Sequence, residues 1–90
     1  MAEAQGATGL DFLKAVIAGV ETGCRVGTLV NQPYLRRGFH PTGNLVPFGA
    51  AAAASQMLGL NAAQWAHALG IAATQAAGLL ASGGTMSKPF

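Results

Sequence analysis

Acidic side chains are absent from most of this sequence. All of its carboxylates lie near the N-terminus, at Glu3, Asp11 and Glu21, and none follows. A catalytic pair of carboxylates is therefore excluded beyond Glu21, as is an acidic site for Mg²⁺ or Ca²⁺. The charged residues after Glu21 are all basic: Arg25, Arg36, Arg37 and Lys88. A site in this part of the chain has a positive potential and suits an anionic ligand.

Charge of either sign is scarce, and a long hydrophobic run is also missing. Charged residues make up 9% of the chain, against about a quarter in ordinary domains, although a domain this small needs a polar surface. No run of about 18 residues is free of polar groups, as a membrane span requires. We therefore expect residues 1–90 to form a single partial helical domain cut from the interior of a larger soluble protein.

Cysteine is nearly absent, and so are the signals for export and for nucleic-acid binding. Cys24 is alone, which excludes a disulfide or a cysteine metal cluster within the chain. Its place among helical apolar positions predicts a buried, reduced thiol. The N-terminus lacks the basic and apolar regions of a signal peptide, so we expect a cytoplasmic protein. The few basic residues form no stripe, so no nucleic-acid partner is predicted.

The first periodic segment predicts a helix over residues 9–30. Thr8 can cap it, with Asp11 completing a variant of the capping box. Glu21 and Arg25 are spaced to pair on one helix face. An apolar stripe recurs at steps of three and four, at Leu10, Leu13, Val16, Ile17, Val20 and Cys24.

The periodicity stops over residues 31–44, which predicts a long irregular loop containing His40. Loops of this length are often functional. The proline after His40 favours an extended backbone at the histidine, and an imidazole can give or take a proton near neutral pH. The alternative is an ordinary loop histidine. Arg36 and Arg37 precede it and should point opposite ways on an extended segment, so at most one faces a substrate; a solvated surface is the alternative for both.

Two further helices are predicted over residues 47–58 and 62–80. Pro47 suits an early helical position, Gly59 a left-handed stop, and Asn61 with Gln64 a capping box. Small apolar residues surround both helices, which predicts that they are buried. His67 lies between alanines in the second of them and is predicted to be structural. The fold class is thus all-α, with about three helices and two Gly/Pro-rich loops.

The chain ends in a loop over residues 82–89. A glycine pair followed by Thr85 and Lys88 is similar to anion-binding loops, but it does not match the phosphate-binding P-loop pattern. Taken alone, this loop is weak support for a site, because a lysine in such a position is more often a plain surface residue than a ligand-binding one.

Several motifs occur together in one order and spacing, and they resemble the MmgE/PrpD family. That family includes 2-methylcitrate dehydratases, cis-aconitate decarboxylases and an iminodisuccinate epimerase. The motifs are Arg37-Gly38-Phe39-His40-Pro41-Thr42-Gly43, the Phe48–Ala54 alanine tract, Leu58-Gly59-Leu60, Ala68-Leu69-Gly70-Ile71-Ala72 and Gly84-Thr85-Met86-Ser87-Lys88-Pro89. The resemblance implies that the chain is about a fifth of a longer enzyme and part of a larger helical domain.

The resemblance also implies site residues. His40 matches the family's acid/base histidine and Lys88 its active-site lysine, which act on a tricarboxylate-like substrate without a metal, an iron–sulfur cluster or another cofactor. Arg36, Arg37 and Thr85 are candidates for binding the substrate. Asn44, Val46 and Pro47 depart from the family's more Gly/Thr-rich turn.

The expected function is that of a fragment of a carbon–oxygen lyase or decarboxylase acting on a di- or tricarboxylate. The family also draws on an upstream histidine and on a downstream lysine and tyrosine that this chain lacks, so the 90 residues alone should be inactive. We expect a homo-oligomer or dependence on the rest of the enzyme. A non-catalytic packing or oligomerisation module and a small membrane-associated helical hairpin remain alternatives.

Overall fold

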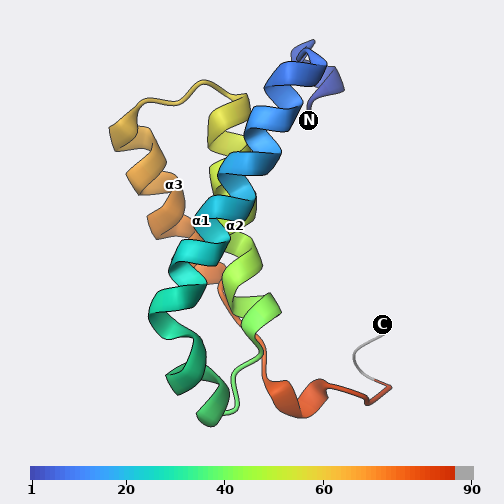
Figure 1. The fold of residues 1–90 in the computed structure, drawn as a ribbon, viewed down its shortest axis with the longest axis vertical. Coiled ribbons are helices and arrows are strands. Elements are labelled where there is room, and N and C mark those ends of the chain that lie inside the picture. Colours follow the sequence, from blue (N-terminus) through green and yellow to red (C-terminus); the bar gives the residue numbers. More distant parts are fainter. Residues whose placement is uncertain (87–90) are drawn as a thin grey trace.

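The computed structural model describes residues 1–86, apart from the side chain of Asn31. Three helices form the molecule: α1 (Gly9–Arg36), α2 (Pro41–Met57) and α3 (Ala62–Gln75). Two short 3-10 turns flank them, η1 (Glu3–Gln5) and η2 (Leu80–Ser82). The helix α2 packs against both α1 and α3 (Figure 1). The predicted all-α class is confirmed.

Two helix starts are formed by the local pairs that the sequence predicts. The backbone N–H of Asp11 donates to the Thr8 hydroxyl, and the Asp11 carboxylate accepts from the Thr8 N–H. The hydrogen bond from the Thr8 hydroxyl, and then that from its N–H, lower the pKa of the Asp11 carboxyl below its ordinary value. Asn61 and Gln64 make the same reciprocal bonds at 3.0 and 2.9 Å. Both capping boxes are confirmed.

The predicted loop over residues 31–44 is wrong, because both flanking helices extend into it. The first helix continues through Pro33 to Arg36, and the second begins at Pro41, so Pro47 lies inside a helix. Pro41 is compatible with the first position of α2, because the N–H that proline lacks would have no partner there. Only residues 37–40 remain between the two helices. The rings of Tyr34 and Phe39 pack against each other across this short turn, with their centroids 4.8 Å apart.

The third helix is shorter than predicted. It ends at Gln75 rather than near residue 80, because the chain after it pairs with the α1–α2 turn instead of continuing the helix. An isolated antiparallel bridge joins Phe39 to Leu79. Gly78 adopts a φ of +135°, which other residues rarely adopt.

Small residues hold α1 and α2 together. The buried apolar side chains within residues 1–86 are all alanines, at Ala15, Ala52 and Ala72. The backbones touch where Gly19 faces Gly49: a Cβ on Gly19 would lie 2.8 Å from the Gly49 oxygen, and a Cβ on Gly49 2.9 Å from the Gly19 oxygen. Close approach of this kind requires glycine on both helices.

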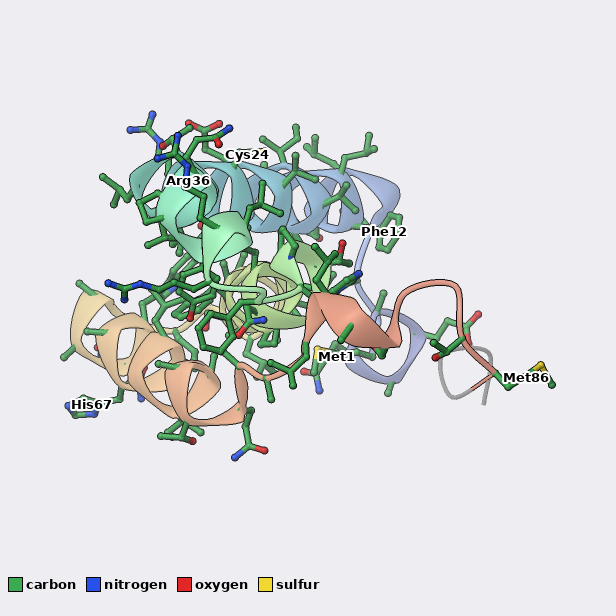
Figure 2. The ribbon with its side chains drawn as sticks, turned by 90° about the horizontal axis from the view of Figure 1, so that it is seen from below. Met1, Phe12, Cys24, Arg36, His67 and Met86 are labelled. Carbon is green, nitrogen blue, oxygen red and sulfur yellow. The ribbon has the colours of Figure 1, made fainter. Side chains whose placement is uncertain are left out.

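The predicted apolar stripe of α1 faces solvent rather than the other helices. Ile17 and Val20 are 66% and 62% exposed, and Figure 2 shows side chains of α1 pointing away from the other helices. Cys24 is exposed, so the predicted buried thiol is wrong. The expected burial of α3 is also wrong, since Ala72 is its one buried residue, and His67 points outward (Figure 2). Within residues 1–86, no helix is long and apolar enough to cross a membrane.

The glycine contact predicts opposite effects for two matched substitutions. Gly19→Ala should destabilise the protein by about 1–3 kcal/mol, since the new methyl group meets backbone. Gly70→Ala should stabilise it by about 0.5–1 kcal/mol, because a Cβ at Gly70 meets nothing within 4 Å. Urea unfolding followed by circular dichroism measures both. Equal stabilisation by the two alanines would show that the helices do not touch at Gly19.

The exposed stripe predicts self-association of the 90-residue chain, because burying these side chains against another copy removes apolar surface from water. The double variant Ile17→Lys/Val20→Lys should shift the chain towards monomer in sedimentation velocity. As a control, Gln5→Lys/Gln32→Lys adds the same charge at exposed positions outside the stripe. A strictly monomeric parent chain with a sharp cooperative melt would contradict this prediction.

Candidate functional site

His40 is the N-cap of α2, and its ring is held by the helix that it caps. Its backbone is extended, with φ −83° and ψ 112°, as predicted from Pro41. The ring atom Nδ1 accepts the N–H of Gly43 at 3.0 Å. A nitrogen that accepts a hydrogen bond carries no proton, so the neutral ring has its proton on Nε2. The half-buried His40 therefore has a defined tautomer and a restricted orientation.

A segment distant in sequence pairs with the turn that carries His40. The His40 N–H donates to the Gly78 carbonyl at 3.0 Å, and the Leu80 N–H donates to the Gly38 carbonyl at 2.7 Å. The packing is tight, since a Cβ on Gly43 would lie 2.6 Å from the Ala77 oxygen. We call residues 38–44 and 76–80 together the junction. The helix predicted over residues 62–80 left no place for this junction, although Gly78 was a signal that the helix could end there.

Asn44 is a buried polar residue at the centre of the junction. It is only 3% exposed. Its Nδ2 donates to the His40 carbonyl at 2.7 Å and to the Gly78 carbonyl at 3.1 Å. In the sequence, Asn44 stands out only as a departure from the family's pattern. A buried amide needs partners, and here the partners come from both halves of the junction.

Arg36 and Arg37 lie at the end of α1, immediately before the junction. Arg36 is the last residue of the helix and Arg37 its C-cap, so the predicted extended segment with opposite-facing arginines is wrong. Successive residues on a helix are about 100° apart. Both residues are exposed, and Arg36 also suits the negative end of the helix dipole.

The terminal loop is only partly covered by the structure. Thr85 is exposed, and its hydroxyl donates to the Ser82 carbonyl at 2.7 Å. The chain beyond η2 leads away from the three helices towards Met86 (Figures 1 and 2). Lys88 lies outside the described residues. The structure links His40 and Gly38 to residues 78–80, which precede this loop.

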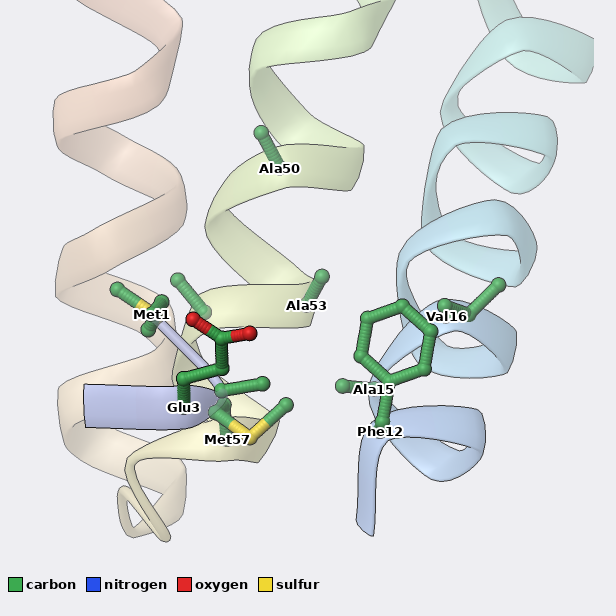
Figure 3. Close-up of a pocket in the computed structure, with 10 residues that line it drawn as sticks. Met1, Glu3, Phe12, Ala15, Val16, Ala50, Ala53 and Met57 are labelled. Atoms are coloured by element: carbon green, nitrogen blue, oxygen red, sulfur yellow. The ribbon is translucent and has the colours of Figure 1, made fainter. Parts of the chain in front are cut away.

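Three hollows elsewhere in residues 1–86 contain none of the predicted site residues. One lies between η1, α1 and the C-terminal part of α2, where Figure 3 shows Glu3, Phe12 and Met57 around an alanine-lined floor. His40 lies at the opposite end of α2. Among residues 1–86, no group of three His, Cys, Asp or Glu side chains is placed to hold a metal ion.

Comparison with known proteins gives a family match over the whole chain. The family described as the MmgE/PrpD N-terminal domain matches residues 1–90. A cis-aconitate decarboxylase-like protein of Aspergillus oryzae is 46% identical over 76 residues, which are 83% of this chain and 16% of that protein. Cis-aconitate decarboxylase of Homo sapiens is 35% identical over 84 residues, 92% of this chain and 18% of that protein.

A third relative agrees with these two. Cis-aconitate decarboxylase of Aspergillus terreus is 37% identical over 81 residues, 87% of this chain and 16% of that protein. The chain thus spans less than a fifth of the length of the curated relatives it matches. No solved structure gives a significant match.

Proposed function

Because the chain belongs to the MmgE/PrpD family, we propose that it forms one part of the active site of a lyase acting on a di- or tricarboxylate. The family and the names of its relatives indicate a dehydratase- or decarboxylase-type enzyme. One observation carries the proposal: the ring of His40 is fixed by Gly43, while its backbone is joined to the segment that leads to the terminal loop.

Elimination of water or carbon dioxide from such an acid requires a proton to be moved at carbon. His40 performs this task in the proposal, because an imidazole can exchange a proton near neutral pH. In the tautomer that the Gly43 bond selects, Nε2 carries the proton and can donate it, or a hydrogen bond, where negative charge develops. To accept a proton at Nε2, the neutral ring would first have to adopt the other tautomer, with its proton on Nδ1. That tautomer cannot accept the Gly43 N–H, so the helix cap would be lost at a cost of about 1 kcal/mol.

A cation is also needed to hold the carboxylate beside the reacting carbon. Lys88 supplies it in the proposal, as a compact ammonium that could also donate a proton in a desolvated site. Arg36, Arg37 and Thr85 are candidate contacts for the remaining polar groups of the substrate. The lack of carboxylates after Glu21 and the positive end of the α2 dipole beside His40 both favour an anionic ligand.

The proposal also covers the cellular location of the enzyme, its assembly and its binding partners. We propose a cytoplasmic homo-oligomer, or a chain dependent on further parts of the enzyme, that binds a small carboxylate and has no nucleic-acid or membrane partner. No metal or other cofactor enters the chemistry as proposed.

The alternative is a non-catalytic packing or oligomerisation module. The exposed apolar stripe of α1 favours it, because a face of this kind is suited to burial against another helical surface. The two functions differ in what they require of His40, since a packing module needs only the helix cap and not a proton-transfer group.

Substitutions of His40 separate the cap from the chemistry. In the complete enzyme, His40→Asn should keep the cap, because asparagine is a preferred N-cap. It should nevertheless lower the turnover number by roughly 10²-fold or more through loss of the proton-transfer group. Lys88→Ala should lower turnover to a similar extent by removing charge stabilisation. Steady-state kinetics and circular dichroism measure turnover and folding.

His67→Asn is the matched control, because His67 is exposed on α3 and should tolerate the change. Near-native turnover in His40→Asn would remove His40 from the chemistry and favour the packing module. Near-native turnover in Lys88→Ala would reject the role of the lysine alone.

If Arg36 or Arg37 binds a substrate carboxylate, its replacement should weaken substrate binding, whereas replacement of another exposed arginine should not. Replacing the substrate-binding arginine by alanine should raise the Michaelis constant by about tenfold or more, as expected for a lost hydrogen bond to a charged group. Arg25→Ala is the control, since Arg25 pairs with Glu21 on the surface of α1. An unchanged Michaelis constant in both Arg36→Ala and Arg37→Ala would assign the pair to the protein surface.

A further inference from the structure

We propose that Asn44 is a positioning residue that fixes His40 relative to the segment leading into the terminal loop. The inference rests on the proposed function of His40. Asn44 lies in the first turns of α2 and is almost fully buried. Its side chain bridges two carbonyl groups that are far apart in the sequence, those of His40 and Gly78.

The two hydrogen bonds of Asn44 close a compact arrangement around the backbone of His40. The His40 carbonyl accepts both the N–H of Asn44, at 3.2 Å, and its Nδ2, at 2.7 Å. The Gly78 carbonyl accepts both the N–H of His40, at 3.0 Å, and Nδ2 of Asn44, at 3.1 Å. The backbone of His40 is thus held at its N–H and at its carbonyl, and Asn44 contributes to both attachments.

The chemistry of the amide explains why asparagine suits this position. A side-chain NH₂ group has two donors on one nitrogen, which is what two converging carbonyls require. Aspartate has the same shape but no donor when ionised, and leucine has a similar volume but no polar atom. A serine in a helix can bond the carbonyl four residues earlier, which here belongs to His40, but its side chain is too short to bridge to Gly78 as well.

Without the amide, two backbone hydrogen bonds would still join the halves of the junction, from His40 to Gly78 and from Leu80 to Gly38. The junction would be loosened rather than lost. Small displacements of a catalytic group matter, because a misplacement of about 1 Å can cost roughly 10²-fold in rate. Asn44 therefore acts on the reaction through His40 and the loop, without touching substrate.

The test uses Asn44→Leu and Asn44→Ser in the complete enzyme, with Asn61→Ala as a control that removes a helix cap elsewhere. Hydrogen exchange measured by mass spectrometry on peptides covering residues 35–45 and 74–83 monitors the amides of His40 and Leu80. Asn44→Ser should increase this exchange by about threefold to tenfold, as expected for one lost hydrogen bond. Asn44→Leu should increase it further, because leucine removes both hydrogen bonds of the amide. Asn61→Ala should leave the junction peptides unchanged.

The kinetic arm distinguishes positioning from stability. Asn44→Leu should lower turnover by about tenfold or more with little change in the Michaelis constant, and Asn44→Ser should act in the same direction. In a His40→Ala background, Asn44→Leu should have little further effect, because residues that act through one another are not additive. Should Asn44→Leu fail to fold, Asn44→Ser carries the same comparison.

Two results would overturn the inference. One is that hydrogen exchange in the junction peptides and the turnover number are the same in the Asn44 variants as in Asn61→Ala. The other is an equal loss of turnover with and without the His40 side chain, which would assign Asn44 to the fold alone. Retention of turnover in His40→Ala would instead reject the proposed function, and the exchange measurement would then decide by itself whether Asn44 holds the junction.

Discussion

The contact between the backbones of Gly19 and Gly49 determines how the rest of this chain is arranged. Two helices can approach this closely only where neither has a side chain, so the small-residue face of α1 turns towards α2. The large apolar residues of α1 are then left on its outer surface. As a result, the protein has an interior of alanine and glycine and an exterior rich in larger apolar groups, which reverses the usual distribution.

Predictions that depend on neighbouring residues succeeded, whereas those that depend on which face of α1 forms the core did not. The capping boxes at Thr8 and Asn61 and the left-handed Gly59 were predictable, because they depend on residues within four positions of one another. The burial of the apolar stripe and of Cys24 was not, because the usual assumption that the larger apolar face forms the core fails here. Periodicity identified the faces of α1 but not the face that contacts α2.

The candidate site was predictable in its residue types and not in its geometry. His40 was singled out from its neighbours Gly38 and Pro41, and its extended backbone follows from Pro41. Its hydrogen bond to Gly43 could not be inferred, because residues 41–44 were expected to be irregular rather than the first turn of a helix. The role of Asn44 depends on Gly78, which is 34 positions further along the chain, and no local pattern encodes a pairing over that separation.

The end of α3 has a mechanical consequence. The helix stops at Gln75, and a few residues later the chain is attached to the backbone of His40 through Gly78. The position of the C-terminal end of α3 is therefore coupled to the position of the His40 backbone. Contacts made at a distance from His40 can in this way influence the alignment of its ring.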